Sequence, residues 1–552
     1  MQFKETLVQL LFLFLPALAI CQTTYLPQGA KENIILERLE IKRGTDSILN
    51  FSKTKPFSRR QFIPHLARID SGLSKVDQYN LYTANISNLE WAIGERSQYA
   101  SKKPLGKNFY QTPANLYEVN TKDFFLAVNP VFQYYVGKEN NNDQHIFLNT
   151  RGITLRGRIA DKIGFAAYIT DNQERDPLYV QQWVTERQAV PGAGFYKDFK
   201  RTGYDYFDAR GYITFNATKY IDVVFGYDKN FIGNGHRSLF LSDFSNNSLF
   251  LKLNTRIWKF NYQNIFMELQ NAERVGADIL VPKKYAAMHH LDLAVTKWLN
   301  IGVFEGVVFG RTNHVEFGYL NPVIFYRSVE QQNGSFDNAV AGLDAKANVA
   351  KKYQFYGQLL LDEFKLSEIK SNRGWWANKF GWQLGAKAID VAGINNLDVQ
   401  LEINRVRPFT YSHRDSVANY THYNQPMAHP LGANFNEFIG IVRYQPAPRW
   451  LLKLNTVQYM QGRDTGSVSF GGNIFLPNVA PFRNRDYGFD VGEGVRTNVG
   501  YTSFLASYEL RPNLFIEANA VVRNQKALGK SVNTFVAFFG IRWNMHRRDF
   551  DF

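Results

Sequence analysis

The sequence predicts an all-β fold: an outer-membrane antiparallel β-barrel of about 18 strands, preceded by a small N-terminal helical periplasmic element. Three observations support it. Polar and apolar residues alternate along most of the chain after residue 121, and short turns alternate with long loops. No segment after the first 21 residues offers the ~18 consecutive apolar residues of a spanning helix. The mean hydropathy of −0.32 fits a barrel, which hides its hydrophobicity in every second residue.

Residues 1–21 predict a secretory signal peptide. Lys4 supplies the positive charge, and residues 7–18 supply an apolar core too short for a typical spanning helix. We expect cleavage after Cys21, because Ala19 and Cys21 are small; a lipoprotein is disfavoured because Ile20 precedes the cysteine. Since Cys21 is the only cysteine, the mature chain has neither a disulfide nor a thiolate metal site.

Residues 22–100 predict the mostly helical element on the periplasmic side. In "AKENIILERLEIKRG", apolar residues recur near helical spacing, and Gly44 can end the helix. Ser58 and Ser74 are candidate N-caps of two further helices, and Pro64 limits the first of these. An even number of strands places both ends of the barrel on the periplasmic side, next to this element.

Residues 121–552 predict the transmembrane β-barrel with long external loops. In "LDVQLEIN" (397–404), the odd positions are apolar and the even positions polar or acidic. Both a β-sandwich and a membrane barrel supply the wet face that this pattern needs. Loop lengths separate the two folds. Connections such as 160–162 and 510–513 are short, whereas 230–246 and 463–497 are long, which is typical of outer-membrane barrels.

The interior of this barrel is expected to be polar and ion-paired. By strand parity, Arg156, Arg158 and Arg542 face the lumen, where they can pair with Asp398, Glu402 and Glu517. Such pairs would keep the barrel plugged.

The net charge of +15 points to an acidic partner. In an exported protein we expect acidic surface polysaccharide or outer-membrane lipid, and no nucleic acid. The motifs GxSxG and HExxH are absent, so we predict neither an enzyme nor a cofactor. His413 and His422 lie in one long loop and are candidate ligand-binding residues. Their spacing fits no standard metal site, so no metal is expected.

The stretch "FGYDKNFIGNGHRSLFLSDFSNN" (225–247) predicts an external loop or a lumen plug. A phosphate-binding loop is excluded, because His236 stands where that motif needs lysine and no helix follows. We retain Asn234, His236 and Arg237 as candidate ligand-binding residues. Arg237 is expected to be an exposed loop cation that acts together with Arg373.

The stretch "SNRGWWANK" (371–379) combines Arg373 with Trp375 and Trp376. Aromatic faces stack on sugar rings, and an arginine fork grips the carboxylates of acidic sugars. The three residues are therefore candidates for glycan binding. The alternative is an aromatic girdle, in which tryptophan lies at the level of the lipid head groups.

Several stretches resemble the capsule assembly protein Wzi family. In that family a strand ends in G-x-x, and a W/I-G-x-G-like turn, "SLxLS" and asparagines follow, as at 225–247. The loop "YSHRDSVANYTHYNQPMAHPLGANFNEFIGIVRY" resembles the family's late loop. The N-terminal "LPQGAKENIILERLEIKRG" and the tail "RWNMHRRDFDF" resemble its version from gliding bacteria, the gliding motility protein RemB.

The resemblance implies an eighteen-stranded outer-membrane barrel with a periplasmic helical bundle, which attaches capsular polysaccharide to the cell surface. The expected function is therefore non-enzymatic binding or organisation of that polysaccharide. Two alternatives stay open. One is an accessory role in gliding motility or type IX secretion, through a protein partner bound by residues 22–100. The other is a transport pore.

Overall fold

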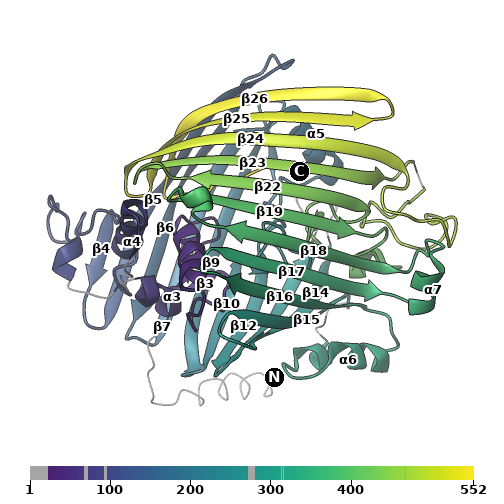
Figure 1. The fold of residues 1–552 in the computed structure, drawn as a ribbon, viewed down its shortest axis with the longest axis horizontal. Helices are drawn as coiled ribbons and strands as arrows, with labels where there is room; N and C mark the ends of the chain where they lie inside the picture. Colours follow the sequence, from purple (N-terminus) through teal and green to yellow (C-terminus); the bar gives the residue numbers. More distant parts are fainter. Residues whose placement is uncertain are drawn as a thin grey trace.

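The computed structural model describes residues 23–66, 72–92, 96–271, 280–311, 314, 316–466 and 468–552. The predicted signal peptide lies outside the described residues. Most of the described residues form a closed antiparallel barrel (Figure 1), which confirms the predicted fold class.

Among the described residues, eighteen long strands make up the wall. They are β5 (Phe124–Glu139), β6 (Ile146–Ile159), β7 (Ile163–Arg175), β9 (Gly203–Thr218), β10 (Ile221–Asp228), β12 (Ser248–Ile257), β13 (Phe260–Gln270), β14 (Lys283–Ala294), β15 (Leu299–Phe309), β16 (Asn338–Val349), β17 (Tyr353–Glu363), β18 (Lys379–Ala388), β19 (Leu397–Val406), β22 (Phe435–Tyr444), β23 (Trp450–Arg463), β24 (Val495–Arg511), β25 (Leu514–Ala527) and β26 (Lys530–Trp543). Each pairs with the next, and β26 pairs with β5, so the wall has no free edge.

The outer face of the wall is apolar and its inner face is polar, as the alternation predicted. In β19, Leu401 and Ile403 are 47% and 46% exposed, whereas Glu402 and Asn404 are fully buried. Val522, Phe535 and Phe539 continue this exposed apolar belt on β25 and β26. A closed barrel with an apolar belt presents its outside to lipid. The protein is therefore an outer-membrane barrel.

The two ends of the barrel differ. One end carries short connections, such as 160–162 and 512–513, and we call it the short-turn end. The other carries the long connections 229–247, 310–337, 407–434 and 464–494, and we call it the long-loop end.

The smaller elements lie in these connections and at the N-terminal side. They are β1 (Tyr25–Leu26), α2 (Glu32–Arg43), β2 (Thr54–Lys55), β3 (Phe57–Ser58), α3 (Arg59–Leu66), α4 (Lys75–Ser87), η1 (Arg96–Tyr99), β4 (Tyr117–Asn120), α5 (Leu178–Arg187), β8 (Lys197–Phe199), β11 (Phe231–Ile232), η2 (Phe317–Leu320), α6 (Tyr326–Gln332), α7 (Leu366–Ser371), η3 (Val391–Gly393), η4 (Ser416–Ala418), β20 (Thr421–His422) and β21 (Gln425–Pro426). No helix in the described part of the chain is long and apolar enough to cross a membrane.

Residues 23–66 and 72–92, which we call the N-terminal element, contain α2, α3 and α4 around a common apolar core. α2 ends at Gly44, whose φ of 68° is left-handed, as the sequence predicted. The Ser74 hydroxyl accepts a hydrogen bond from Asp77 N at 2.9 Å and caps α4. The Ser58 hydroxyl accepts from Gln61 N at 3.3 Å at the start of α3.

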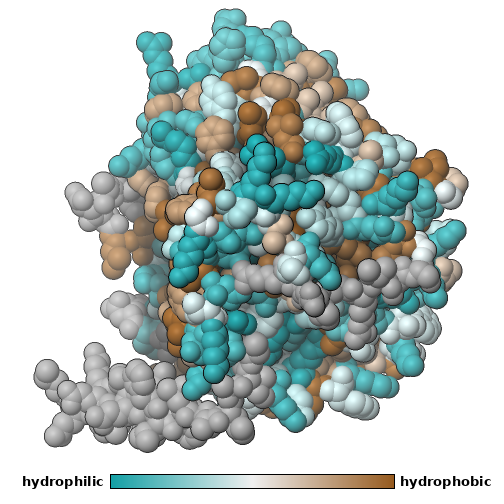
Figure 2. Space-filling model, turned by 90° about the vertical axis from the view of Figure 1, so that its left-hand side faces the viewer, coloured by the Kyte–Doolittle hydropathy of each residue, from teal (hydrophilic) through white to brown (hydrophobic). Residues whose placement is uncertain are grey.

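Ion pairs join the N-terminal element to the short-turn end. Lys31 pairs with Glu509 of β24, and Glu37 pairs with Lys387 of β18. Asp398 of β19 pairs with Arg38 of α2, so its partner is a helix residue rather than an arginine of the wall. Figure 2 looks at this end, where polar side chains, in teal, lie between apolar ones in brown.

The lumen is filled by the long-loop connections. Residues 229–247 fold inside the barrel, and we call them the plug. Of the two predictions for this stretch, an external loop or a lumen plug, the second is therefore correct. Phe240 is fully buried and stacks on Phe304 of the inner wall, with ring centroids 4.5 Å apart. β11 of the plug pairs with β2 of the N-terminal element. The predicted wall pair also forms: Arg542 donates to Glu517 at 2.8 Å.

Candidate functional site

Two loops meet at the long-loop end and form the candidate site. Backbone hydrogen bonds hold residues 373–376 against residues 486–489. Trp376 N donates to Asp486 O at 3.0 Å, Gly488 N donates to Arg373 O at 2.9 Å, and Phe489 N donates to Gly374 O at 2.9 Å. The side chains that this pairing brings together form what we call the aromatic–arginine patch: Arg373, Trp375, Trp376, Arg483, Arg485 and Tyr487.

Guanidinium groups lie over aromatic rings throughout this patch. Arg373 Cζ is 4.4 Å from the ring centroid of Tyr487, and Arg483 Cζ is 4.1 Å from that of Trp376. Arg485 Cζ is 4.9 Å from the ring of Phe489 beneath the patch. Cation–π contacts of this kind favour an ordered guanidinium plane over each ring. The patch thus presents flat apolar surfaces next to fixed positive charges.

Two of the arginines are open to solvent. The Arg373 side chain is 57% exposed and contacts Glu368 at 3.0 Å, and the Arg485 side chain is 42% exposed and contacts Glu493 at 2.7 Å. Exposed ion pairs of this kind contribute little, roughly 0–1 kcal/mol each. An incoming carboxylate can therefore replace the protein's own carboxylate at either arginine with little loss of stability.

The turn that places Arg373 and Trp375 in the patch requires glycine at position 374. Gly374 has a φ of +66°, a left-handed conformation that glycine adopts without strain. A Cβ atom there would also lie 2.8 Å from Phe489 N, in the middle of the paired loops. Arg407 supports the same turn from below, because its Nη2 donates to Phe489 O at 3.0 Å.

Of the eight residues predicted from sequence, the structure brings Arg373, Trp375 and Trp376 together and places the other five elsewhere. Trp375 and Trp376 are half-buried, with ring centroids 6.4 Å apart. Trp376 also packs edge-on against Phe409, at a centroid distance of 6.0 Å.

Asn234, His236 and Arg237 lie in the plug. The expectation that Arg237 is an exposed loop cation beside Arg373 is wrong. Arg237 is only 7% exposed, because it lies in the lumen. Arg237 donates to Asp551 Oδ1 at 2.9 Å and to Glu437 at 3.4 Å. Asn234 Nδ2 donates to the hydroxyl of Ser52 at 3.1 Å, which joins the plug to the N-terminal element.

Asp551 is the acceptor at the centre of this cluster. Residues 544–552, which we call the tail, return into the lumen, and His236 Nε2 lies 2.7 Å from Asp551 Oδ2. Burial alone would raise the pKa of Asp551, but Arg237 and His236 outweigh it and hold the pKa well below its usual range. The carboxyl is therefore charged at neutral pH, and it forms an ion pair with Arg237 inside the protein.

His413 and His422 do not converge on a common site. His413 Nδ1 accepts from Asp415 N at 3.2 Å. His422 Nδ1 accepts from Gln270 N at 3.0 Å, and burial lowers the pKa of His422 to about 4, so it is neutral at pH 7. Within the described ranges, no group of three or more His, Cys, Asp or Glu residues is placed to hold a metal ion.

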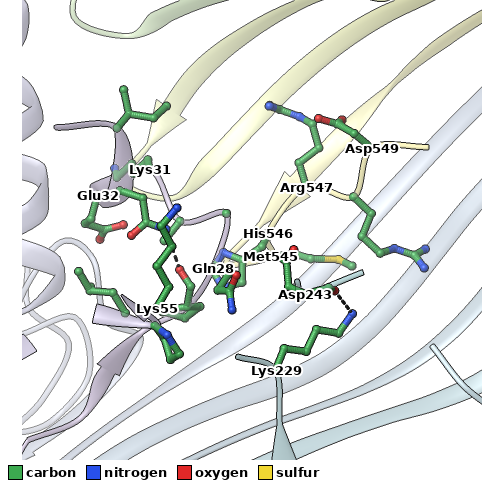
Figure 3. Close-up of a pocket in the computed structure, with 18 of the residues that line it drawn as sticks. Gln28, Lys31, Glu32, Lys55, Lys229, Asp243, Met545, His546, Arg547 and Asp549 are labelled. Carbon is green, nitrogen blue, oxygen red and sulfur yellow. Dashed lines mark hydrogen bonds between the residues drawn. The ribbon is translucent and has the colours of Figure 1, made fainter. Parts of the chain in front are cut away.

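A cavity of about 650 Å³ lies deeper in the lumen, between the N-terminal element, the plug and the tail. Fourteen Lys and Arg residues and eight Asp and Glu residues line it. Figure 3 shows residues of all three segments around it, and Lys229 Nζ donates to the backbone O of Asp243 at 3.0 Å. Residues of the short turns, such as Arg449 and Asn513, also line this cavity, so it extends towards the short-turn end, away from the patch.

Sequence reasoning missed Arg483, Arg485 and Tyr487. They lie in "RNRDYG", in a long loop without periodicity, more than a hundred residues after Trp376. Two arginines and a tyrosine within five residues were the available signal, and it repeats the residue types of "RGWW". Only the folded loops show that the two stretches meet.

No protein-family model matches the chain. No curated protein matches it either. Among solved structures, the chain is similar to Escherichia coli Wzi, with 13% identity and a TM-score of 0.58, over 95% of this chain and 100% of that one. That protein is described as a carbohydrate-binding β-barrel involved in group 1 capsule assembly. Pseudomonas aeruginosa OprD matches with 11% identity and a TM-score of 0.41, over 77% of this chain and 96% of that one. The likeness supports a Wzi-like fold and does not extend to the gliding-motility version of that family.

Proposed function

We propose that this outer-membrane barrel binds acidic surface polysaccharide, without catalysing a reaction, and that the aromatic–arginine patch is the binding surface. The observation that carries the proposal is the exposure of Arg373 and Arg485 beside half-buried aromatic faces at the long-loop end. Sugar rings stack on such faces, and guanidinium groups bind the carboxylates of acidic sugars. The fold shared with a carbohydrate-binding barrel supports the same proposal.

The proposal includes an orientation. In outer-membrane barrels the short turns face the periplasm and the long loops face outward. The patch then faces the cell exterior, and the N-terminal element, within residues 22–100, lies in the periplasm. A polymer outside the cell reaches the patch directly, whereas the lumen cavity is separated from it by the plug.

Binding at this surface is weak for each repeat unit of the polymer. Exposed charges are screened over about 10 Å at 0.1 M salt, so affinity falls as salt rises. Neighbouring proteins in the membrane bind neighbouring repeats of one chain, and this multivalency holds the polymer at the surface.

The test uses the purified barrel in detergent and two polymers, a uronic-acid polysaccharide and neutral dextran. We expect binding to the acidic polymer only, and its loss in the double variant Arg373→Ala, Arg485→Ala. Trp376→Ala should weaken binding at every salt concentration, because stacking is not screened by ions. Equal binding of both polymers, or unchanged binding by the double variant, contradicts the proposal.

Arg151→Ala is the matched control. The Arg151 side chain is also 57% exposed and pairs with Asp171 at 3.0 Å, but it lies on the outer wall away from the patch. It should bind the acidic polymer as the unchanged protein does.

The two alternatives have their own readouts. A transport pore requires an open lumen, and the buried plug and tail disfavour it; steady conductance in planar bilayers would support the pore. A role in gliding motility or type IX secretion, through a partner of residues 22–100, predicts normal capsule but lost movement of surface proteins after gene deletion.

A further inference from the structure

Three polar residues form a row across the outer face of the barrel. Asn264 of β13 is the direct cross-strand partner of His289 of β14, and His289 is the direct partner of Glu305 of β15. All three side chains are on the lipid-facing side of the wall, yet Asn264 and Glu305 are only 2% and 4% exposed. A carboxylate in contact with lipid is unfavourable, so the row requires a cover.

Residues 316–332, which we call the flap, provide that cover. The flap leaves the long-loop end, folds back over the outside of the wall and contains η2 and α6. Tyr326 N and Arg327 N each donate to one oxygen of the Glu305 carboxylate at 2.9 Å. The ring of Tyr326 stacks on that of His289, with centroids 4.3 Å apart.

Apolar contacts extend this attachment. Tyr319 packs against Phe309 of β15 at a centroid distance of 4.7 Å. Along the outer face of β15, Ile301 and Val303 are 42% and 48% exposed, whereas Val307 and Phe309 are at most 1% exposed. The flap therefore covers the half of β15 nearest the long-loop end and leaves the other half open.

The length of β15 places the flap within the membrane. β15 has 11 residues, Leu299–Phe309, and a membrane-spanning strand needs about 9–11. The whole strand is thus used to cross the hydrocarbon layer. A segment that lies against its upper half from outside occupies space that lipid would otherwise fill.

The outward side of the flap is apolar up to Phe325, which suits that position, whereas α6 exposes polar side chains such as Arg327, 49% exposed. Phe317, Val323 and Phe325 are 82%, 83% and 62% exposed, and they continue the apolar belt formed by Val303 and Leu343. Figure 1 shows α6 beside β15, outside the sheet.

We propose that the flap is inserted into the lipid leaflet on the long-loop side, with Phe317, Val323 and Phe325 in contact with acyl chains. The Glu305 carboxylate holds the flap against the wall by accepting hydrogen bonds from the backbone N–H groups of residues 326 and 327. The occupant of this surface is lipid, because the surface is continuous with the lipid-facing belt and lies at the height of a strand that is only just long enough to span.

The test uses site-directed spin labels on the complete barrel in liposomes. Cys21 is the only cysteine in the sequence and lies in the predicted signal peptide, so the mature protein is expected to be a background free of cysteine. Single labels are placed at Phe325→Cys and Val323→Cys. Leu343→Cys, in the belt of β16, is the lipid control, and Leu528→Cys, 79% exposed at the tip between β25 and β26, is the water control.

We expect labels at 323 and 325 to behave as at 343: frequent collisions with oxygen, which dissolves in lipid, and loss of collisions with a water-soluble nickel chelate. Adding Glu305→Ala should increase label mobility at 325 and leave 343 unchanged. Nickel accessibility equal to that at 528 would place the flap in water and overturn the proposal. Loss of collisions with both reagents would show that a protein covers the flap, and would also overturn it.

Discussion

Arg237 of the plug donates to Asp551 of the tail at 2.9 Å, although 314 residues of chain separate them. The same carboxylate accepts from Asn455 Nδ2 of the wall strand β23 at 3.0 Å. One buried carboxylate therefore ties together the plug, the tail and the wall. The lumen is closed by a specific network of charges as well as by apolar packing.

The first prediction concerns this pair. Arg237→Ala leaves Asp551 and Glu437 buried without their main cation, and breaking a buried pair in this way costs about 3–5 kcal/mol. We expect the free energy of unfolding in denaturant, measured on the barrel in detergent, to fall by that order. Arg373→Ala is the comparison, because exposed substitutions usually change stability by about 0.5 kcal/mol or less.

A double variant separates the pair from its surroundings. Arg237→Ala with Asp551→Ala should be less destabilised than the sum of the two single variants, because no unpaired carboxylate is then left at 551. Strict additivity would mean that the two residues do not interact.

The second prediction tests the geometry of the patch without removing a contacting side chain. Gly374→Ala places a Cβ 2.8 Å from Phe489 N and strains a left-handed residue. We expect binding to the acidic polysaccharide to fall while Arg373, Trp375 and Trp376 are all present. Gly393→Ala is the control: its φ is +78°, but no atom lies within 4 Å of the added Cβ. Equal binding losses in both variants would count against a positioned patch.

The third prediction concerns pH and the N-terminal element. Burial alone would raise the pKa of Glu37, but Lys387 and Arg443 outweigh it and hold the pKa below its usual value of 4.5. A carboxyl with a lowered folded pKa contributes stability above its unfolded pKa, and that stability is lost as pH falls through the folded pKa.

The N-terminal element should therefore become more accessible as pH falls from about 4.5 towards 2. Pepsin, which is active in this range, should release fragments of residues 23–92 more rapidly at the lower pH values. Glu37→Gln should show faster release at pH 4.5 and a weaker dependence on pH. A pH dependence identical to that of the unchanged protein would exclude Glu37 as a contributor.

The fourth prediction tests orientation. Epitope tags inserted after Gly529 or at Leu366 lie at the long-loop end and should be labelled by antibody on intact cells. Tags inserted at Lys351 or Asn513 lie in short turns and should be labelled only after the outer membrane is opened. The opposite pattern would reverse the orientation and place the patch in the periplasm.

Local patterns predicted the wall well. β19 runs from Leu397 to Val406, where the alternation at 397–404 predicted a strand, because a period of two depends on neighbouring residues alone. The long connection predicted at 463–497 spans 464–494 in the structure, because a glycine-rich stretch obscures where β24 begins.

Features that depend on distant partners could not be predicted in this way. Arg237 resembles any loop arginine until Asp551 is placed beside it. The sequence indicated one half of the patch, Arg373 with Trp375 and Trp376, but the other half lies in a loop without periodicity. The cover of His289 by Tyr326 depends on a loop folding back over the outer wall, which no local pattern indicates.

The N-terminal element also has a consequence for the order of assembly. Its partners are spread around the wall: Lys31 meets Glu509 at a sequence separation of 478, and Arg38 meets Asp398 at a separation of 360. Contacts between such distant segments form late, because the intervening chain must first be organised. The element can complete these contacts only when β18, β19 and β24 stand in their final positions. Its docking thus requires that this part of the wall has formed, and a chain arrested before then would leave Glu37 and Arg38 of α2 without their wall partners.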